Sequence, residues 1–400
     1  MAGEEYPVLH LRPGREFAIL RGHPWIFSGA FRELPPAIPA GSVVDVMAAN
    51  GEWVARGQLS PRNSLAFRVL TLDLEEEIDE AFYVRRIERA LALRRLLPVG
   101  LDAYRVVNAE ADFLPGLIVD RFAGVLVVQL HTAGAEAHRR LIVAALERVL
   151  APSGILMRDD VKVREREGLT VEGPTVAAGE VPETVEINEH SVRFLVDPYH
   201  GQKTGFFLDQ REKRHFIGGL APHFTSLLNC FSYSGGFALA ALARKPALQT
   251  VNVDASQAAL DLARRNYILN GHDPAAHEFV ELDVNRFLHE AAAAGRKFGI
   301  VVVDPPAFAK NLSMKERALR GYESLNFAAA RVVAPDGLLL ACSCSGAVSV
   351  EEFEAAVLQG FLRADRAAQL IASFGPSLDH PSLPGFPEDR YLKALLFRMA

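Results

Sequence analysis

The sequence predicts an α/β protein whose C-terminal part holds a parallel sheet, preceded by a β-rich module and an α+β region. Between residues 185 and 400, apolar strand patterns alternate with amphipathic helix patterns, which is typical of a sheet with helices on both faces. Short alternating segments separated by Gly, Pro and Asn fill the first 75 residues. The length of 400 residues, with 50% hydrophobic and 23% charged residues, suits two or three domains with large cores.

Composition narrows the classes of protein to consider. The net charge of −6 argues against a generally basic coat, so any contact with RNA or DNA would come from local patches. Three cysteines, an odd number, do not form a disulfide framework, and no paired Cys/His spacing predicts a metal site. No apolar run approaches the roughly 18 residues that a membrane span requires, and the acidic N-terminus leads into no apolar signal region. We therefore predict a cytoplasmic protein with no membrane partner and no metal.

The first two regions differ in their pattern of predicted strands and helices. Residues 1–75 contain strand patterns at 42–50 and 65–72 and both tryptophans, which predicts a small β-rich module. An acidic stretch then leads into a region that mixes helices and strands, which predicts a compact α+β piece over 76–184. The helices predicted there are 81–97 and 134–150, and the strands are 104–108, 116–122, 125–130 and 154–159.

The third region, 185–400, opens with a hairpin-like pair of strands over 184–198. Buried strands and amphipathic helices then alternate, and this order favours parallel pairing through right-handed crossovers. The predicted strands are 225–231, 250–254, 277–283, 299–304 and 337–343, with helices after the glycine turn near 235 and over 256–270.

The carboxyl ends of three of these strands carry Gly or Asp. "LNCFSYSGGF" (228–237) runs from a buried strand into a glycine turn, where backbone N–H groups can approach a ligand closely. Asp254 ends the next strand, where an acid accepts hydrogen bonds from ribose hydroxyls, and Asp283 ends a third. Because the ends of parallel strands converge on one crevice, these residues predict a cofactor that contains a nucleoside. Helix capping is an equally good interpretation of Asp254 or Asp283 taken singly.

A fourth strand end is more specific. "GIVVVDPPAF" (299–308) places Asp304 after a buried strand, followed by two prolines that fix φ and stiffen the loop. A Pro-Pro pair also ends a strand without any function. An acid, two prolines and an aromatic residue after a glycine turn and two acidic strand ends is the layout of S-adenosylmethionine-dependent methyltransferases that act on nucleobases. The alternative of a dinucleotide-dependent dehydrogenase lacks a G-x-G-x-x-G match.

From about His10 to Arg398 the chain resembles the bacterial 23S ribosomal RNA cytosine-C5 methyltransferases of the RlmI type. The resemblance implies a PUA-like RNA-binding domain, a middle domain and a Rossmann-like catalytic domain, and the sequence rhythm gives their ranges as 1–75, 76–184 and 185–400. It further implies S-adenosylmethionine as cofactor and 23S ribosomal RNA, free or in an assembling large subunit, as partner. A homodimer stays open. The stretches that carry the resemblance are "RGHPWIFSGA" (21–30), "EADFLPGLIVDRF" (110–122), "HGQKTGFFLDQR" (200–211), "LNCFSYSGGF", "VDPPAF", "RGYESLN" (320–326), "CSCSG" (342–346), "DHP" (379–381) and "PEDRYLK" (387–393).

The chain departs from the family at one motif position. The family commonly shows Asp-Pro-Pro-Lys-Phe, whereas this chain has Ala307 in place of the lysine. Any contact that the lysine makes is therefore absent or taken over by a neighbour such as Lys310. The role of Asp304 is unchanged by this departure, but the choice of target base depends on it.

Methylation of cytosine at C5 explains why a cysteine is required. C5 is a poor nucleophile until a thiolate adds to C6, after which C5 can attack a methyl group. The resemblance assigns this thiolate to Cys344, with Cys342 as strand core, although the two side chains share a face of a strand. Burial as a small apolar residue is the alternative for both, and the preferred interpretation of Cys230. Asp304 is expected to stabilise the charge that develops as sulfur adds.

The remaining candidates concern cofactor and RNA. We interpret 201–211 as a flap over the cofactor, with the start of a solvated helix as the alternative, and 158–168 as a phosphate contact or a salt-bridged surface. Aromatic side chains such as Tyr233 and Phe308 are expected to stack on an extruded base or to lie in the core. The predicted cofactor-binding residues are Phe207, Asp209, Gln210, Asn229, Phe231, Tyr233, Gly235, Asp254, Ala255, Ser256, Asp283 and Asp304, and the predicted RNA-binding residues are Arg12, Arg21, His23, Trp25, Phe308, Arg320 and Tyr322.

Two other functions stay open at this point. Acid-Pro-Pro-aromatic loops also serve methylation of guanine or of exocyclic amines, which needs no thiol. A non-catalytic RNA-binding factor for ribosome assembly is the alternative from another class. A non-catalytic factor is disfavoured because the chain keeps all the expected catalytic and cofactor residues at the strand ends, namely Asp254, Asp283, Asp304 and Cys344.

Overall fold

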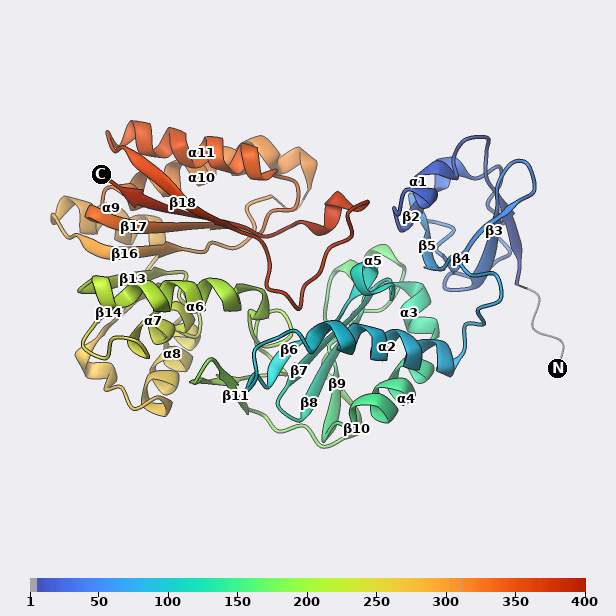
Figure 1. Ribbon diagram of the computed structural model, residues 1–400, viewed down its shortest axis with the longest axis horizontal. Coiled ribbons are helices and arrows are strands. Elements are labelled where there is room, and N and C mark those ends of the chain that lie inside the picture. The colour runs from blue at the N-terminus through green and yellow to red at the C-terminus, as the bar shows by residue number, and fades with distance from the viewer. Residues whose placement is uncertain (1–5, 310) are drawn as a thin grey trace. The chain divides into compact units, whose positions relative to one another are not determined.

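The computed structural model describes residues 6–309 and 311–400, which form two compact units (Figure 1). Unit 1 comprises 1–187, 196–208 and 378–389, and unit 2 comprises 188–195, 209–377 and 390–400. The chain thus returns to unit 1 through a late segment, 378–389. The predicted hairpin is present as β11 (Val185–Glu189) and β12 (Val192–Val196).

The first sheet of unit 1 is the predicted β-rich module. Its five strands are ordered β1-β3-β4-β5-β2, and alternate side chains such as Val44, Val46 and Phe67 are fully buried in one core. This alternation follows from the period of two of a pleated strand with one face in the core. The elements are β1 (Val8–His10), α1 (Phe17–Leu20), β2 (Trp25–Phe27), β3 (Val43–Met47), β4 (Trp53–Leu59) and β5 (Leu65–Thr71).

The second sheet of unit 1 has the order β10-β9-β8-β7-β6. The helix predicted over 134–150 is two helices, α3 and α4, which meet at His138. The side chain of Thr132 accepts a hydrogen bond from the N–H of Ala135 and so caps α3 one residue before the predicted start. The elements are α2 (Glu80–Arg94), β6 (Ala103–Asn108), β7 (Leu117–Phe122), β8 (Val125–Leu130), α3 (Ala133–Ala137), α4 (Arg139–Leu150), β9 (Gly154–Met157), α5 (Val163–Arg166) and β10 (Thr175–Gly179).

Unit 2 contains a seven-stranded sheet with the order β15-β14-β13-β16-β17-β19-β18. The first five strands are parallel, as predicted, and β19 is antiparallel to both of its neighbours. The last two strands lie outside the predicted set. The elements are α6 (Arg211–Leu220), β13 (Ser226–Cys230), α7 (Gly236–Leu242), β14 (Gln249–Asp254), α8 (Gln257–Leu269), β15 (Glu278–Glu281), α9 (Val284–Ala293), β16 (Phe298–Val303), α10 (Lys315–Ala330), β17 (Val333–Ser343), α11 (Val350–Arg363), β18 (Ala368–Phe374) and β19 (Lys393–Met399).

Helices cover both faces of this sheet, which confirms the α/β prediction. Figure 1 shows α10 and α11 on one side and α6 and α7 on the other. Cys230, Val303 and Ala341 belong to the core on the side of α9, α10 and α11. Because strand side chains alternate, Cys342 points to the opposite face from Ala341, the face covered by α6. The chain order reverses at β13, whose neighbours are β14 and β16, and a ligand crevice is expected at the carboxyl ends there.

The expected outcome of Asp112→Asn is a large loss of stability in unit 1. Arg94 donates from two nitrogens to the two carboxylate oxygens of Asp112, at 2.6 and 2.7 Å, and both side chains are buried. Removing one charge of a buried pair leaves the other uncompensated, which costs about 3–5 kcal/mol. Urea denaturation followed by circular dichroism measures the loss. Asp336→Asn, which alters an exposed pair with Arg398, is the matched control and is expected to change stability by less than about 0.5 kcal/mol.

Candidate functional site

The turn after β13 has an unusual backbone. Phe231, Tyr233 and Gly235 all have φ in the left-handed region, at 57°, 44° and 78°. Two of the three carry side chains that disfavour this conformation, and such strain concentrates at functional sites. A Cβ at Gly235 would lie 3.3 Å from side-chain atoms of Ala263 and Tyr267, so α8 packs closely against this turn. The turn therefore brings backbone rather than side chains to the crevice.

Asp254, at the end of β14, fixes the neighbouring loop. Its carboxylate accepts hydrogen bonds from the backbone N–H of Tyr233 and of Ser256, each at 3.0 Å. Helix capping is the wrong interpretation of Asp254, because the side chain of Ser256 is the one that accepts the N–H of Ala259 at the start of α8. Asp254 thus joins the glycine turn to the next strand end.

Asp283 has a different place. Its side chain accepts the N–H of Arg286 at 3.0 Å and caps α9, so the capping interpretation is confirmed for this residue. The carboxylate of Asp283 is exposed and can accept further hydrogen bonds. The predicted contact between Asp283 and the cofactor stays a prediction.

The carboxyl ends of β13 and β14 fit a nucleoside cofactor such as S-adenosylmethionine. The hydroxyl of Ser232 is buried in the turn without a hydrogen-bond partner among the described residues. A buried polar group of this kind is normally satisfied, and a ligand in the crevice would supply the missing partner. Gly235 and Gly236 are buried in the turn, where the N–H of Gly235 donates to the carbonyl of Ser232 at 2.8 Å, and Asp254 supplies a carboxylate at the neighbouring strand end. The other predicted cofactor residues at these strand ends, Asn229, Phe231, Tyr233, Ala255 and Ser256, surround the same turn or follow it on β14.

Asp304 ends β16, on the other side of β13 from β14. Its carboxylate accepts a hydrogen bond from the side-chain amide of Gln210 at 2.8 Å, and Gln210 itself is 2% exposed. Lys213, one turn further along α6, is also buried and donates to the backbone carbonyls of Asp209 and Gly375. Burial lowers the pKa of Lys213, and the nearby carboxylates of Asp209 and Asp304 raise it. A buried amide thus orients Asp304, and a buried cation lies close to it.

Residues 208–211 form the start of a helix, and the prediction that 201–211 close over the cofactor stays a prediction. A short 3-10 turn over Leu208–Gln210 leads directly into α6. The segment is buried rather than solvated, and the carboxylate of Asp209 accepts a hydrogen bond from the hydroxyl of Tyr391 at 2.7 Å. Phe207 belongs to unit 1, where the amine of Lys203 lies over its ring, and its contact with the adenosine stays a prediction.

The three cysteines have different surroundings. Cys230 is fully buried, and burial raises the pKa of its thiol. Cys342 is 1% exposed, and burial together with the negative charge of Asp304 raises its thiol pKa well above the ordinary value. Cys344 is partly exposed, and its sulfur lies 3.9 Å from the carbonyl oxygen of Pro305, in the loop that begins with Asp304. Of the three, Cys344 alone combines exposure with a place beside this loop.

The aromatic pair next to this loop is only partly available to RNA. Phe308 is half-buried and stacks on Tyr322, with ring centroids 4.7 Å apart. Tyr322 is fully buried, and its hydroxyl bonds to those of Ser343 and Ser345. The prediction that Tyr322 contacts RNA is therefore wrong, because its ring is buried and stacks against Phe308. Arg320 is exposed on α10, Ala307 is half-buried, and Lys310 lies outside the described residues.

Sequence reasoning missed a buried lysine near Cys344. Lys393, the first residue of β19, donates to the backbone carbonyls of Ser345 and Val348, each at 2.7 Å. The only sequence signal was its place at the end of "PEDRYLK". Its position beside the loop depends on the pairing of Ser343 with Lys393 across β17 and β19.

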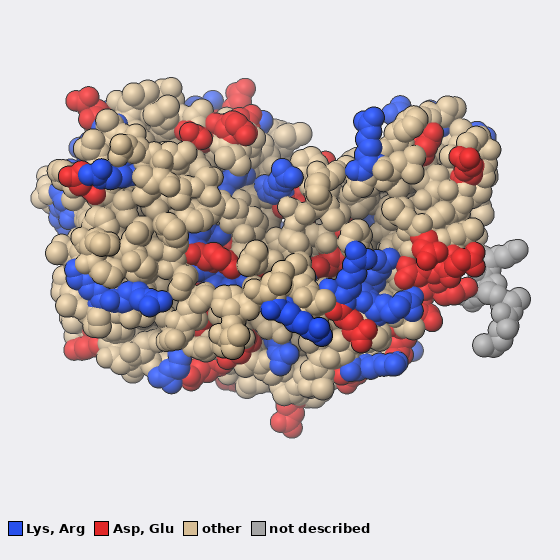
Figure 2. Space-filling model, viewed as in Figure 1, with Lys and Arg blue, Asp and Glu red and all other residues tan. Residues whose placement is uncertain are grey.

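The predicted RNA-binding residues of the first module divide into exposed and internal groups. Arg12 and Arg21 are exposed, although the guanidinium of Arg12 also donates to the carbonyl of Phe31. His23 and Trp25 are half-buried, and the indole N–H of Trp25 donates to Glu110 at 2.9 Å. Trp25 also lines a cavity of about 620 Å³ in unit 1. Figure 2 shows basic and acidic side chains interspersed on the face in view, which agrees with local rather than general electrostatic binding.

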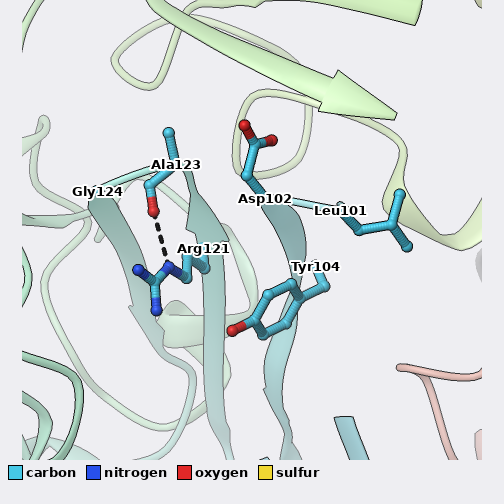
Figure 3. Close-up of a pocket in the computed structure, with 6 residues that line it drawn as sticks. All are labelled: Leu101, Asp102, Tyr104, Arg121, Ala123 and Gly124. Carbon is cyan, nitrogen blue, oxygen red and sulfur yellow. Dashed lines mark hydrogen bonds between the residues drawn. The ribbon is translucent and has the colours of Figure 1, made fainter. Parts of the chain in front are cut away.

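A second open cavity of unit 1 lies apart from the predicted residues. It has a volume of about 430 Å³ and lies at the edge of β6 and β7 (Figure 3). Tyr104 and Arg121 are cross-strand partners there, and the guanidinium of Arg121 donates to the carbonyl of Ala123 at 2.7 Å. Most residues of the run 158–168 are exposed, but Arg158 and Arg164 are buried and pair with Asp160 and Asp159. The salt-bridged interpretation of this run is therefore confirmed for these two arginines.

The described residues contain neither a membrane-spanning helix nor a metal-binding cluster. In residues 6–309 and 311–400, no helix combines the length and apolar character that crossing a bilayer demands. Over the same residues, no group of three or more His, Cys, Asp or Glu side chains is arranged to hold a metal ion. The cytoplasmic location and the absence of a metal stay predictions.

Sequence comparison matches both ends of the chain to known families. A PUA-like domain matches residues 9–72, and the S-adenosylmethionine-dependent methyltransferase family matches residues 111–398. A protein from Klebsiella pneumoniae (strain 342), named ribosomal RNA large subunit methyltransferase I, is 41% identical over 403 residues, which cover 100% of both chains. A protein of the same name from Shigella dysenteriae serotype 1 (strain Sd197) is 40% identical over 393 residues, which cover 98% of both.

Solved structures share the fold. A methyltransferase complexed with SAH has a TM-score of 0.84, and a SAM-dependent methyltransferase from Streptococcus mutans has a TM-score of 0.81. Each is 22% identical, and the alignment covers 98% of this chain and 100% of the other. The predicted architecture of a PUA-like module followed by a Rossmann-like methyltransferase domain is confirmed, whereas the domain boundaries at 75 and 184 stay predictions.

Proposed function

Because this chain belongs to the ribosomal RNA large subunit methyltransferase I family, we propose that it forms 5-methylcytosine in 23S ribosomal RNA through a covalent bond between Cys344 and C6 of the base. The observation that carries this proposal is the partly exposed sulfur of Cys344 beside the loop of Asp304, 3.9 Å from the carbonyl of Pro305. A methyltransferase that acts on nitrogen needs no thiol at this place.

The proposed chemistry begins at Cys344. Its thiolate adds to C6, and the electron pair of the C5–C6 double bond is delocalised over C5, C4 and N3. C5 thereby becomes nucleophilic. Bound S-adenosylmethionine supplies the electrophilic methyl group that C5 takes up. Loss of the proton from C5 then restores the double bond as sulfur leaves C6, so the cysteine is regenerated.

Asp304 is proposed to stabilise charge on the pyrimidine. As sulfur adds to C6, negative charge develops over N3 and the C2 carbonyl, and a carboxyl group that shares a proton with N3 lowers the energy of that state. The amide of Gln210 donates to one oxygen of Asp304 and so helps to fix the direction of the carboxylate. Gln210 is therefore proposed to orient the acid rather than to contact the cofactor.

The cofactor is proposed to lie across the carboxyl ends of β13 and β14. The glycines of the turn let the amino acid part of the cofactor approach closely, and Asp254 suits the ribose hydroxyls. The RNA is proposed to contact the exposed Arg12 and Arg21 of the PUA-like module and the face of Phe308. Free 23S RNA and an assembling large subunit both stay open as the form of the substrate, and a homodimer stays open as well.

The expected outcome of Asp254→Asn is weaker cofactor binding without loss of fold. The substitution removes the negative charge and one of the acceptors that hold Tyr233 and Ser256. A hydrogen bond to a charged group contributes about 1.5–3 kcal/mol, so the Kd for S-adenosylmethionine is expected to rise roughly 10- to 100-fold. Isothermal titration calorimetry measures it. Asp261→Asn, on the exposed face of α8, serves as the control, and an unaltered Kd in Asp254→Asn would contradict the assignment.

The identity of the product tests the function as a whole. Ribosomal RNA from a strain that lacks the gene is digested and mapped by mass spectrometry, beside RNA from the parent strain. The proposal expects one 5-methylcytosine to disappear from 23S RNA. Loss of a methylguanine or of an N-methylated base instead would refute it.

A further inference from the structure

The proposed chemistry gives no role to the buried lysine at the start of β19. Lys393 is 2% exposed, and its amine donates to the carbonyl oxygens of Ser345 and Val348. Both carbonyls belong to the loop that begins at Cys344, directly after β17. One side chain thus ties this loop to the neighbouring strand at two points.

The charge of Lys393 interacts with Cys344. Burial lowers the pKa of Lys393 to about 8, while negative charge on Cys344 and Glu352 opposes this shift. Carbonyl dipoles only partly replace water around a buried ammonium group, so a nearby anion stabilises it further. The attraction is mutual, and an ammonium group beside a thiol favours the thiolate.

We propose that Lys393 is a positioning residue for Cys344, which fixes the loop 344–348 and holds a positive charge beside the sulfur so that the thiolate forms at neutral pH. This inference rests on the proposed role of Cys344 as nucleophile. The thiol proton passes to solvent, and the lysine keeps its own. Because the thiolate is the species that attacks C6, the fraction of ionised Cys344 sets the fraction of competent enzyme.

The other titratable groups around Cys344 do not supply this charge. Tyr322 on α10 and Cys342 on β17 have pKa values raised by burial and are neutral near pH 7. The carboxylate of Glu352 on α11 is paired with Lys315, and that of Asp304 at the end of β16 raises the pKa of Cys342. Negative groups disfavour a further anion, whereas the cation of Lys393 favours a thiolate.

The test is the pH dependence of alkylation at Cys344. The full-length protein is treated with iodoacetamide over a series of pH values, and the rate at Cys344 is followed by mass spectrometry of its peptide. The midpoint is expected below about 8.5, the value of an unperturbed thiol. In Lys393→Met the midpoint is expected to rise by about one pH unit or more, which lowers alkylation at neutral pH roughly tenfold. Lys393→Arg keeps the charge and is expected to recover most of the rate.

A second lysine provides the matched control. The amine of Lys245 also bridges two backbone carbonyls, those of Pro222 and Phe224, but no cysteine interaction accompanies it among the described contacts. Lys245→Met therefore removes a similar clamp and is expected to leave the alkylation midpoint of Cys344 unaltered. A midpoint that shifts equally in Lys245→Met and Lys393→Met would overturn the specific role of Lys393.

Two further results would overturn the inference. One is a midpoint at or above about 8.5 in the unaltered protein, which needs no substitution and so decides the matter even where Lys393→Met does not fold. The other is a folded Lys393→Met with the original midpoint. Alkylation uses neither RNA nor S-adenosylmethionine, so failure here is distinct from failure of the proposed methylation of cytosine.

Discussion

Replacement of Cys344 by Ala is expected to abolish the formation of 5-methylcytosine, by at least about 10³-fold in kcat. Without sulfur on C6, C5 of cytosine has too little electron density to take up a methyl group. The partly exposed position of Cys344 means that the smaller side chain leaves no deep cavity, so the fold and the binding of S-adenosylmethionine are expected to persist. Transfer of labelled methyl groups to 23S RNA, with calorimetry for the cofactor, measures both quantities.

Cys342→Ala is the matched control for this experiment. Cys342 lies in β17, two residues before Cys344, but is 1% exposed, and its raised thiol pKa keeps it protonated. Its replacement is expected to cost about 1 kcal/mol of stability and to leave methylation within a few-fold of the original. If Cys344→Ala retained activity and Cys342→Ala lost it, the assignment of the nucleophile would be reversed. If both retained it, the reaction would not use a thiol.

The covalent intermediate is open to a direct test. In RNA whose target cytosine carries fluorine at C5, no proton is available for removal after methyl transfer, so sulfur cannot leave C6. The unaltered protein is expected to form a stable complex with this RNA that survives denaturing electrophoresis, whereas Cys344→Ala is expected to form none.

Asp304→Asn is expected to lower kcat by about 10²- to 10⁴-fold. The substitution preserves shape and one acceptor for the amide of Gln210, but it removes the ionisable group that stabilises charge on the ring. Single-turnover methylation measures the chemical step, and calorimetry measures the affinity for S-adenosylmethionine. A loss confined to that affinity would make Asp304 a cofactor-binding residue and would contradict its catalytic role. Asp336→Asn, an exposed residue of the same unit, controls for the substitution itself.

The local pattern of the chain was sufficient for the architecture of unit 2. Apolar runs such as 299–303 are buried on both faces of a parallel sheet, and that burial leaves a clear signal in a single sequence. The helix 134–150 shows the limit, since the backbone leaves the helical conformation at His138, with φ −100° and ψ 14°, and the periodicity does not show this break. The strands β18 and β19 were not among the predicted strands, and their antiparallel pairing at the end of the sheet has no fixed sequence spacing.

The candidate site was only partly predictable, because some of its features depend on contacts between residues that are distant in the sequence. Asp254, Asp304 and Cys344 follow their strands directly, so the chemistry expected at a strand end identified them. Whether an acid caps a helix depends on its distance from the next N–H groups, and this separated Asp283 from Asp254. Tyr322 has the same aromatic character as Phe308, and only packing shows that one ring covers the other.

The sequence by itself determined the α/β class, the five parallel strands of unit 2, the family and the residue types at the strand ends, because these depend on neighbours along the chain. The tertiary structure alone decided which thiol is accessible, that Gln210 holds Asp304, and that Lys393 reaches the loop of Cys344. These contacts join residues far apart in the chain, and strand register and the direction of each side chain bring them together.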